Sequence, residues 1–279
     1  MVTPTGKLIP IGGSENKDCA EKGDCSQSFY QTGVLKRLLT EMPGNNPRLE
    51  IVPTASGIPQ TVTRRYIEAF NKLGCHDIGV IPVESREDAL NDSYIDRIQK
   101  ADGIFFTGGD QSRLSRFFGN TPFIQAVYQR YMHNNFVVAG TSAGAMAMSV
   151  EMITGSSVTD KDDVEMGRGL SLINNVIIDT HFVERGRYGR LARAVAANPG
   201  YIGIGLGEDA GLVVKDGSEI EVIGSGQVVI MDDKAMIHQR FKDYAPASAP
   251  SLESLPFHLL AMHDTYNLEN SLYEILEAY

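Results

Sequence analysis

Two periods of apolar residues alternate along about the first 200 positions. Short apolar runs that end in glycine, proline or serine are typical of buried strands. Such strands are predicted in KLIPIGG from Lys7, RLEIVPTAS from Arg48, HDIGVIPV from His76, DGIFFTGGD from Asp102 and NFVVAG from Asn135. Between them, apolar side chains recur every three or four residues, which is the spacing of one helix face. Helices are predicted over Phe29 to Glu41, Pro59 to Leu73, Arg86 to Lys100 and Thr121 to His133.

After about residue 200 the pattern changes to strand runs separated by short turns that contain glycine or aspartate, which predicts antiparallel hairpins. A last helix is predicted over Glu269 to Glu277. Strands that alternate with helices imply a parallel sheet covered on both faces. The predicted fold class is therefore α/β: one domain, residues 1–279, with a mostly parallel doubly wound sheet, helices on both faces, and antiparallel hairpins in the C-terminal third.

Glycines and small polar residues gather where the predicted strands end. They form four clusters, namely Gly12-Gly13-Ser14-Glu15, Pro53-Thr54-Ala55-Ser56, Thr107-Gly108-Gly109-Asp110-Gln111 and Gly140-Thr141-Ser142-Ala143-Gly144. In open α/β sheets a ligand binds beyond the carboxyl ends of the strands. We therefore expect a functional site at this edge.

Ser142 lies between two glycines, after a predicted strand and before a predicted helix. This is the context of a nucleophile elbow, in which a sharp turn exposes a reactive hydroxyl. A tight turn that only links a strand to a helix is the alternative. The backbone around Gly108, Gly109 and Asp110 and the N–H group of Ala143 are candidates for an oxyanion hole.

A reactive serine needs a base, and the base needs a partner that orients it. His181 follows the predicted strand Asn175–Ile178, which places it at the same sheet edge as Ser142. The alternative is a half-buried histidine that caps the next helix. Glu208 follows another buried strand at the presumed carboxyl edge and is the candidate third member, with Asp209 as its competitor.

α/β-Hydrolases order their triad as nucleophile, acid, histidine. That order requires His258 or His263 as the base, although FHLLAMHDTY, which contains both, is better interpreted as a late strand and its turn. Arg185, Arg187 and Arg190 follow His181 and form either a solvated helix face or a binding site for a carboxylate. Gln111 is a further polar group at this edge.

Composition narrows the range of functions. The net charge of −10 argues against a nucleic-acid partner, and no apolar run approaches the roughly 18 residues needed to span a membrane. The start, MVTPTGKLIPIGG, lacks the layout of a signal peptide, so a cytoplasmic protein is expected, with a secreted or periplasmic protein as the alternative if a leader has been removed. Cys19 and Cys25 are interpreted as ordinary loop thiols rather than a local disulfide or metal site. The acidic run Asp160–Asp163 lacks the spacing of a calcium loop.

Six ordered segments resemble the cyanophycinases, serine peptidases in a family that also contains aspartyl dipeptidase. They are IPIGGSE, IVPTASGIP, FTGGDQSRL, GTSAGAMAMS, IIDTHFVERGRYGRL and GIGLGEDAGLVV, and the resemblance runs from about Lys7 to Val229. It implies a fold similar to class I glutamine amidotransferases, and a triad of Ser142, His181 and Glu208. In the hypothesis built on this triad, the N–H groups of Gly109 and Ala143 hold the oxyanion.

The resemblance also implies an exopeptidase that releases β-aspartyl-arginine dipeptides from cyanophycin, a polyaspartate that bears arginine on each side-chain carboxyl. No metal or organic cofactor is implied, and relatives suggest a homodimer. The substrate-binding positions fall on Gln111, Asp179, Thr180, Arg185, Arg187 and Arg190. The arginines can hold carboxylates, and Asp179 can accept the substrate's guanidinium.

One motif departs from the family, because Thr180 stands where cyanophycinases usually have glutamine. A threonine cannot offer the paired donor and acceptor of an amide, which favours a preference for another β-aspartyl or acidic peptide. Two alternatives therefore accompany the cyanophycinase hypothesis: a dipeptidase that acts on short aspartyl or β-aspartyl peptides, and a non-catalytic peptide-binding relative.

Overall fold

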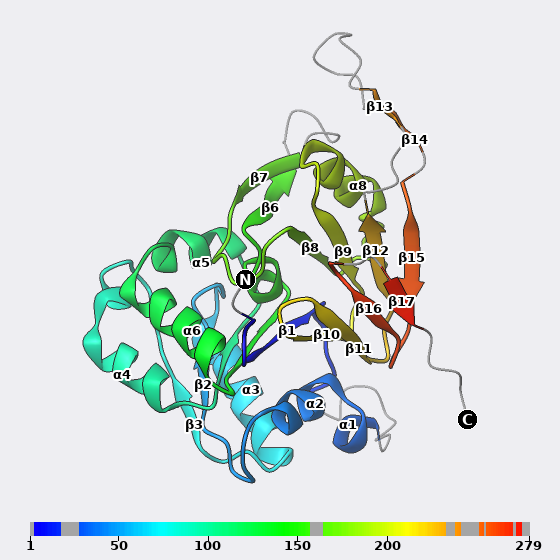
Figure 1. Ribbon diagram of the computed structural model, residues 1–279. Helices are drawn as coiled ribbons and strands as arrows, with labels where there is room; N and C mark the ends of the chain where they lie inside the picture. Colours follow the sequence, from blue (N-terminus) through cyan, green and yellow to red (C-terminus); the bar gives the residue numbers. More distant parts are fainter. Residues whose placement is uncertain are drawn as a thin grey trace.

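A computed structural model describes residues 3–17, 28–156, 164–232, 238–240, 251–253, 255–269 and 272–274, and two sheets form its centre (Figure 1). The main sheet has the strand order β17-β16-β11-β10-β1-β5-β4-β2-β3. Its strands are β1 (Lys7–Ile11), β2 (Leu49–Val52), β3 (Ile78–Val80), β4 (Gly103–Phe106), β5 (Val137–Thr141), β10 (Ala210–Lys215), β11 (Glu219–Gly224), β16 (Thr265–Asn267) and β17 (Leu272–Glu274).

The half of this sheet from β1 to β3 is parallel, as predicted, and β10 joins β1 antiparallel. Helices cover both faces: α2 (Val34–Glu41) and α3 (Pro59–Lys72) on one, and α4 (Asp92–Lys100), α5 (Gln111–Phe118) and α6 (Pro122–His133) on the other (Figure 1). The adjacent residues Phe105 and Phe106 belong to different core clusters, because successive side chains of a strand point to opposite faces. The predicted fold class is confirmed.

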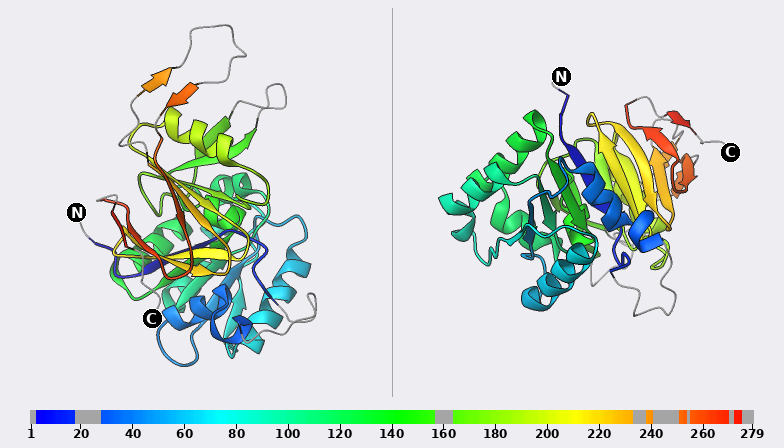
Figure 2. Two further views of the ribbon diagram at one scale, coloured as in Figure 1. Left: turned by 90° about the vertical axis from the view of Figure 1, so that its right-hand side faces the viewer. Right: turned by 90° about the horizontal axis from the view of Figure 1, so that it is seen from below.

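A second, four-stranded sheet has the order β15 (Phe257–Leu260), β12 (Val228–Asp232), β9 (Ile202–Leu206) and β8 (Val176–Thr180). Its apolar side chains share a core with β10 and β11 of the main sheet, and α8 (Tyr188–Ala197) packs on β9. The right-hand view of Figure 2 shows the yellow strands on one side and the green helices on the other. The prediction that His181 follows a strand of the same sheet as Ser142 is wrong, because β10 occupies the free edge of β1 and leaves β8 and β9 to pair with each other.

Two predicted helices are each divided. The first is α1 (Ser28–Gln31) followed by α2, with an extended Gly33 between them. The third is the 3₁₀ turn η1 (Asp88–Leu90) followed by α4, which begins where the Asn91 side chain accepts a hydrogen bond from the Ser93 N–H (3.0 Å).

The helix predicted over Glu269 to Glu277 is wrong where the structure describes this segment. Leu272–Glu274 form β17, which pairs antiparallel with β16 and places Tyr273 opposite Tyr266. Pairing along a sheet edge outweighs the weak helix preference of the segment.

Several small elements accompany the sheets. They are α7 (Ala143–Met146), the ribbon of β6 (Glu151–Ser156) and β7 (Val164–Arg168), and the ribbon of β13 (His238–Arg240) and β14 (Ser251–Glu253). Within the described ranges, no helix is both long and apolar enough to cross a membrane. Cys19, Cys25 and the run Asp160–Asp163 lie outside the described residues.

Candidate catalytic site

Ser142 occupies a sharp turn between β5 and α7, as the sequence predicts. Its φ of 51° and ψ of −112° lie in a region that residues other than glycine rarely adopt. The turn is held by the Ser142 N–H, which donates to the Ile11 carbonyl (2.9 Å), and by the Ser142 carbonyl, which accepts from the N–H groups of Ala145 and Met146. A strained serine held in this way presents its hydroxyl at the carboxyl end of the sheet.

The flanking glycines are needed because the backbones approach closely. A Cβ on Gly140 would lie 2.6 Å from the carbonyl carbon of Gly144, and a Cβ on Gly144 would lie 2.3 Å from the Phe106 carbonyl oxygen. Both distances are far inside van der Waals contact, so a side chain at either position would push α7 away from β4 and β5.

His181 directly follows β8 and faces Ser142 across the boundary between the sheets. Its Nε2 lies 3.0 Å from Ser142 Oγ, and its Nδ1 lies 2.7 Å from Glu208 Oε1. An ionised carboxylate only accepts hydrogen bonds, so Nδ1 carries the proton that is donated to Glu208, and Nε2 is left to accept the Ser142 proton. His181 also has a positive φ (46°), and its N–H donates to the Gly12 carbonyl.

Glu208 follows β9, next to β8 in the second sheet. The hydrogen bond from His181 holds the pKa of the Glu208 carboxyl below its ordinary value, against the opposing effect of burial, and the Ser14 side chain and the Arg185 charge act in the same direction. Glu208 therefore remains a carboxylate through mildly acidic conditions. Serine, histidine and carboxylate form a continuous hydrogen-bonded chain, which is the geometry that activates a serine for nucleophilic attack.

The competing candidates point elsewhere. The Asp209 carboxylate accepts from the Asn16 N–H (3.1 Å) and the Ser225 hydroxyl (2.6 Å). His258 lies on β15 beside the Tyr266 ring, and the exposed His263 lies 3.9 Å from Glu221. The structure thus brings His181 and Glu208 to Ser142.

The predicted oxyanion donors lie beside the serine. Gly108 is so close that a Cβ there would lie 3.3 Å from Ser142 Cβ, and Gly109 has a φ of 146° that only glycine adopts readily. Ala143 is the first residue of α7. The N–H groups of Gly109 and Ala143 have no acceptor within the described part of the chain. Both are available to a ligand oxygen.

Asp179, Arg187 and Arg190 form a buried ion cluster, which we call the Asp179 cluster. Asp179 has no exposed surface; Arg187 Nη1 (3.0 Å) and Arg190 Nε (2.9 Å) donate to its carboxylate, and Arg190 Nη2 donates a second hydrogen bond. Arg187 also donates to the Thr180 carbonyl (2.7 Å), and its burial lowers the pKa of its guanidinium. In this arrangement the cluster fixes the chain on either side of His181.

The other predicted binding residues lie in three different environments. Gln111, at the start of α5, donates through Nε2 to the carbonyls of Ile153 (2.8 Å) and Thr154 (3.2 Å) in β6. Thr180 is 1% exposed, and its hydroxyl has no hydrogen-bond partner in the described structure. Arg185 is exposed, and its charge acts on Glu208. Of the three, Arg185 is the one that is open to a ligand.

Sequence reasoning missed the role of the loop Ile11–Asn16. Its backbone carbonyls accept from Ser142, His181 and Asp209, and its buried Glu15 accepts from the Thr141 hydroxyl (2.8 Å). The signal was a glutamate that follows an apolar strand, two glycines and a serine, at the edge where the site was expected.

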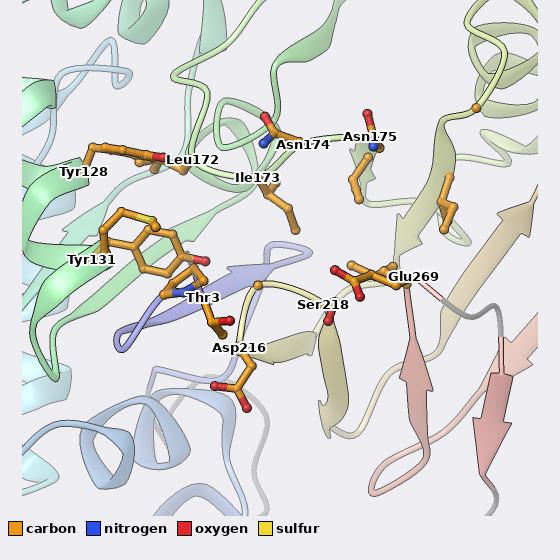
Figure 3. Close-up of a pocket in the computed structure, with 17 residues that line it drawn as sticks. Thr3, Tyr128, Tyr131, Leu172, Ile173, Asn174, Asn175, Asp216, Ser218 and Glu269 are labelled. Atoms are coloured by element: carbon orange, nitrogen blue, oxygen red, sulfur yellow. The ribbon is translucent and has the colours of Figure 1, made fainter. Parts of the chain in front are cut away.

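A cavity of about 690 Å³ lies away from these residues (Figure 3). It is lined by Tyr128 and Tyr131 of α6, by Asn175 and Val176 at the start of β8, and by the turn around Asp216. Because β8 starts at this cavity and ends beside His181, the length of the strand separates the two. Among the described residues, no group of three or more His, Cys, Asp or Glu side chains is placed to hold a metal ion.

Comparison with known proteins identifies relatives of this chain. The sequence model of peptidase family S51 matches residues 21–223. A cyanophycinase of Geminocystis herdmanii is 34% identical over 263 residues, which cover 93% of this chain and 93% of that protein. A cyanophycinase of Trichormus variabilis is 32% identical over 272 residues, covering 96% of this chain and 87% of that protein.

The crystal structure of a peptidase from an acI-B1 actinobacterium is similar in fold. It superposes with a TM-score of 0.67 at 22% identity and covers 95% of this chain and 98% of its own. The two sheets and their flanking helices therefore recur in a peptidase of solved structure.

Proposed function

Because the chain belongs to peptidase family S51 and is a hydrolase, we propose that it hydrolyses cyanophycin to β-aspartyl-arginine dipeptides through an acyl-enzyme on Ser142. The observation that carries this proposal is the chain of two hydrogen bonds from Ser142 Oγ through His181 to Glu208, 3.0 and 2.7 Å long. The substrate class follows from the cyanophycinases to which the chain is similar.

The turn at Ser142 acts as a nucleophile elbow. Ser142 Oγ attacks the carbonyl carbon of the scissile peptide bond while its proton moves to Nε2 of His181, and Glu208 stabilises the imidazolium through Nδ1. The C–N bond then breaks and Nε2 returns the proton to the leaving amine. Water attacks the acyl-enzyme with His181 again as the base, which releases the carboxylic acid and restores the Ser142 hydroxyl.

The N–H groups of Gly109 and Ala143 stabilise the negative charge that the carbonyl oxygen gains during each attack. This assignment is supported by two observations: both N–H groups are unpaired in the described structure, and both adjoin Ser142. One donor of this kind contributes about 3 kcal/mol to transition-state stabilisation.

Arg185 binds a carboxylate of the substrate, because it is exposed and close enough to Glu208 to affect its pKa. Arg187, Arg190 and Asp179 shape this binding region through their ion cluster. Contact of Asp179 with a substrate guanidinium stays a prediction that requires the cluster to open. Gln111 takes part through its amide oxygen, since its Nε2 already donates to β6.

Release of β-aspartyl-arginine from purified cyanophycin, followed by chromatography and mass spectrometry, tests the proposal, with Ser142→Ala as the control. Dipeptide from the parent and none from the variant supports it. A parent that reacts with a fluorophosphonate at Ser142 but leaves cyanophycin intact keeps the serine chemistry and overturns the substrate. A parent that does neither overturns both.

One observation favours a second candidate, the hydrolysis of short aspartyl or β-aspartyl peptides. The shorter Thr180 is buried, without a partner for its hydroxyl, and cannot offer the paired contacts of the glutamine usual in cyanophycinases. A kcat/KM for such dipeptides above that for cyanophycin would establish this candidate instead.

The proposal extends to the oligomeric state and the cellular location: each chain is a single domain, and two chains form a homodimer in the cytoplasm. The resemblance to cyanophycinases supports it. A monomer mass measured by light scattering would contradict the proposed dimer. Activity recovered from outside the cells would contradict the proposed cytoplasmic location.

A further inference from the structure

We propose that Glu15 is a positioning residue of the catalytic site, which keeps the Ser142 turn and the loop Ile11–Asn16 in register so that all three triad members meet. This inference rests on the proposed serine chemistry. It assigns Glu15, Thr141 and Tyr66 a part in catalysis although none of them is placed to touch the reacting atoms.

Glu15 is an acidic side chain buried directly behind the serine. It is 3% exposed, and its Oε2 accepts from the hydroxyl of Thr141, the residue before Ser142. Its Oε1 accepts from the Tyr66 hydroxyl of α3 and lies 3.2 Å from Lys17 Nζ. Three elements, namely the loop after β1, the end of β5 and the face of α3, are thus joined through one carboxylate.

The loop that carries Glu15 touches each segment of the triad. The carbonyl of Ile11 accepts from the Ser142 N–H, and the carbonyl of Gly12 accepts from the His181 N–H, each at 2.9 Å. The carbonyl of Gly13 accepts from the N–H of Asp209, next to Glu208 (3.0 Å). The Ser14 side chain is close enough to Glu208 to lower the pKa of its carboxyl. A shift of this loop therefore displaces nucleophile, base and acid relative to one another.

Gly13 shows how little room the loop has. It has a φ of 106°, and a Cβ there would lie 2.4 Å from the Cε1 atom of the His181 ring. The loop backbone thus packs directly against the imidazole ring. Glu15, two residues further on, is the side chain that links this loop to β5.

The carboxylate is ionised where it lies. Burial by itself raises the pKa of the Glu15 carboxyl, but the Lys17 charge and the hydroxyl groups of Tyr66 and Thr141 more than offset it, so that the pKa lies below its ordinary value. A buried charge with donors on both oxygens is held in one geometry, because any displacement leaves part of it without a partner.

Glu15→Gln tests the inference, because it keeps the shape and removes the charge and one acceptor. We expect kcat to fall between about tenfold and 100-fold with little change in KM, as a small displacement of the reacting groups would cause. The rate of fluorophosphonate labelling of Ser142 should fall in parallel, since labelling needs the same alignment.

Glu50→Gln is the matched control. Glu50 is also buried and also paired, with Arg48 and Arg97, but it lies on β2 away from the triad. Its loss should lower the melting temperature while the folded protein keeps the parent kcat. If Glu15→Gln lowers kcat no more than Glu50→Gln, Glu15 serves general stability and the inference is overturned.

Thr141→Val and Thr141→Ser decide the matter should Glu15→Gln fail to fold. Valine keeps the volume and removes the hydroxyl that donates to Glu15, whereas serine keeps the hydroxyl. We expect a lower kcat in Thr141→Val and recovery of most of the loss in Thr141→Ser. Equal activity in both variants overturns the inference, whereas a parent that is neither active nor labelled overturns the serine chemistry instead.

Discussion

The two sheets supply different parts of the site by different means. The main sheet provides Ser142 and the N–H groups of Gly109 and Ala143, placed by glycines that allow close backbone approach. The second sheet provides His181 and Glu208, placed at the ends of two parallel strands and joined by side-chain hydrogen bonds. The proposed nucleophile and oxyanion donors thus depend on close backbone packing, whereas the proposed base and acid depend on side-chain hydrogen bonds.

Removing the proposed nucleophile from the main sheet, or the proposed base from the second sheet, should abolish the same peptidase activity. We expect Ser142→Ala and His181→Ala each to lower kcat by about 10⁶-fold, and the double variant to lose no more, because the residues act as one unit. Steady-state kinetics on the preferred peptide measures this. Losses that multiply in the double variant would show that the two sheets contribute independently.

Glu208→Gln should have the next largest effect. It keeps the shape but removes the charge that orients and stabilises the imidazolium, so we expect kcat to fall by about 10⁴-fold. Asp209→Asn is the control, because Asp209 pairs with Asn16 and Ser225 rather than with His181. A larger loss in Asp209→Asn than in Glu208→Gln would move the acid of the triad to Asp209.

Asp179→Asn should act on stability. It removes a fully buried charge and leaves Arg187 and Arg190 without their counter-ion, which costs about 3 kcal/mol in the free energy of unfolding. Urea denaturation measures this, and Asp96→Asn, an exposed substitution in α4, should leave the midpoint unchanged. An unchanged midpoint for Asp179→Asn would show that the Asp179 cluster does not stabilise the fold.

Thr180→Val should have the smallest effect and reveals whether this side chain meets substrate. Removing a buried hydroxyl that has no partner should raise the free energy of unfolding by about 1 kcal/mol and leave KM unchanged. If KM rises instead, the hydroxyl binds substrate and the departure from glutamine is a determinant of specificity. Thermal unfolding and initial rates provide both readouts.

Much of the site could be predicted because its residues follow buried strands, and strand ends are visible in the sequence. The glycines around Ser142 and the positions of His181 and Glu208 belong to this class. The second sheet could not be predicted, because periodicity shows that a segment is a strand but not which strand it pairs with.

Other errors have similar causes. The break at Gly33 and the strand at Leu272–Glu274 depend on tertiary contacts that override local preference. Glu15 gave a signal only of polarity at a strand end, because its partners Tyr66 and Thr141 are far from it in sequence. The polar contacts that support a site are thus harder to predict than the groups that react.

The place of β1 in the main sheet means that this strand can pair only after much later parts of the chain have been synthesised. Its neighbours are β5 and β10, so Lys7–Ile11 leaves the ribosome long before either partner has been synthesised. An apolar strand with both edges open is prone to aggregate, so this segment is at risk until its partner strands have been synthesised. β10 begins at Ala210, two residues after Glu208. The strand that covers the last open edge of β1 is therefore synthesised directly after the last member of the proposed triad, so the residues of the proposed site and the protection of β1 are completed at nearly the same point of the chain.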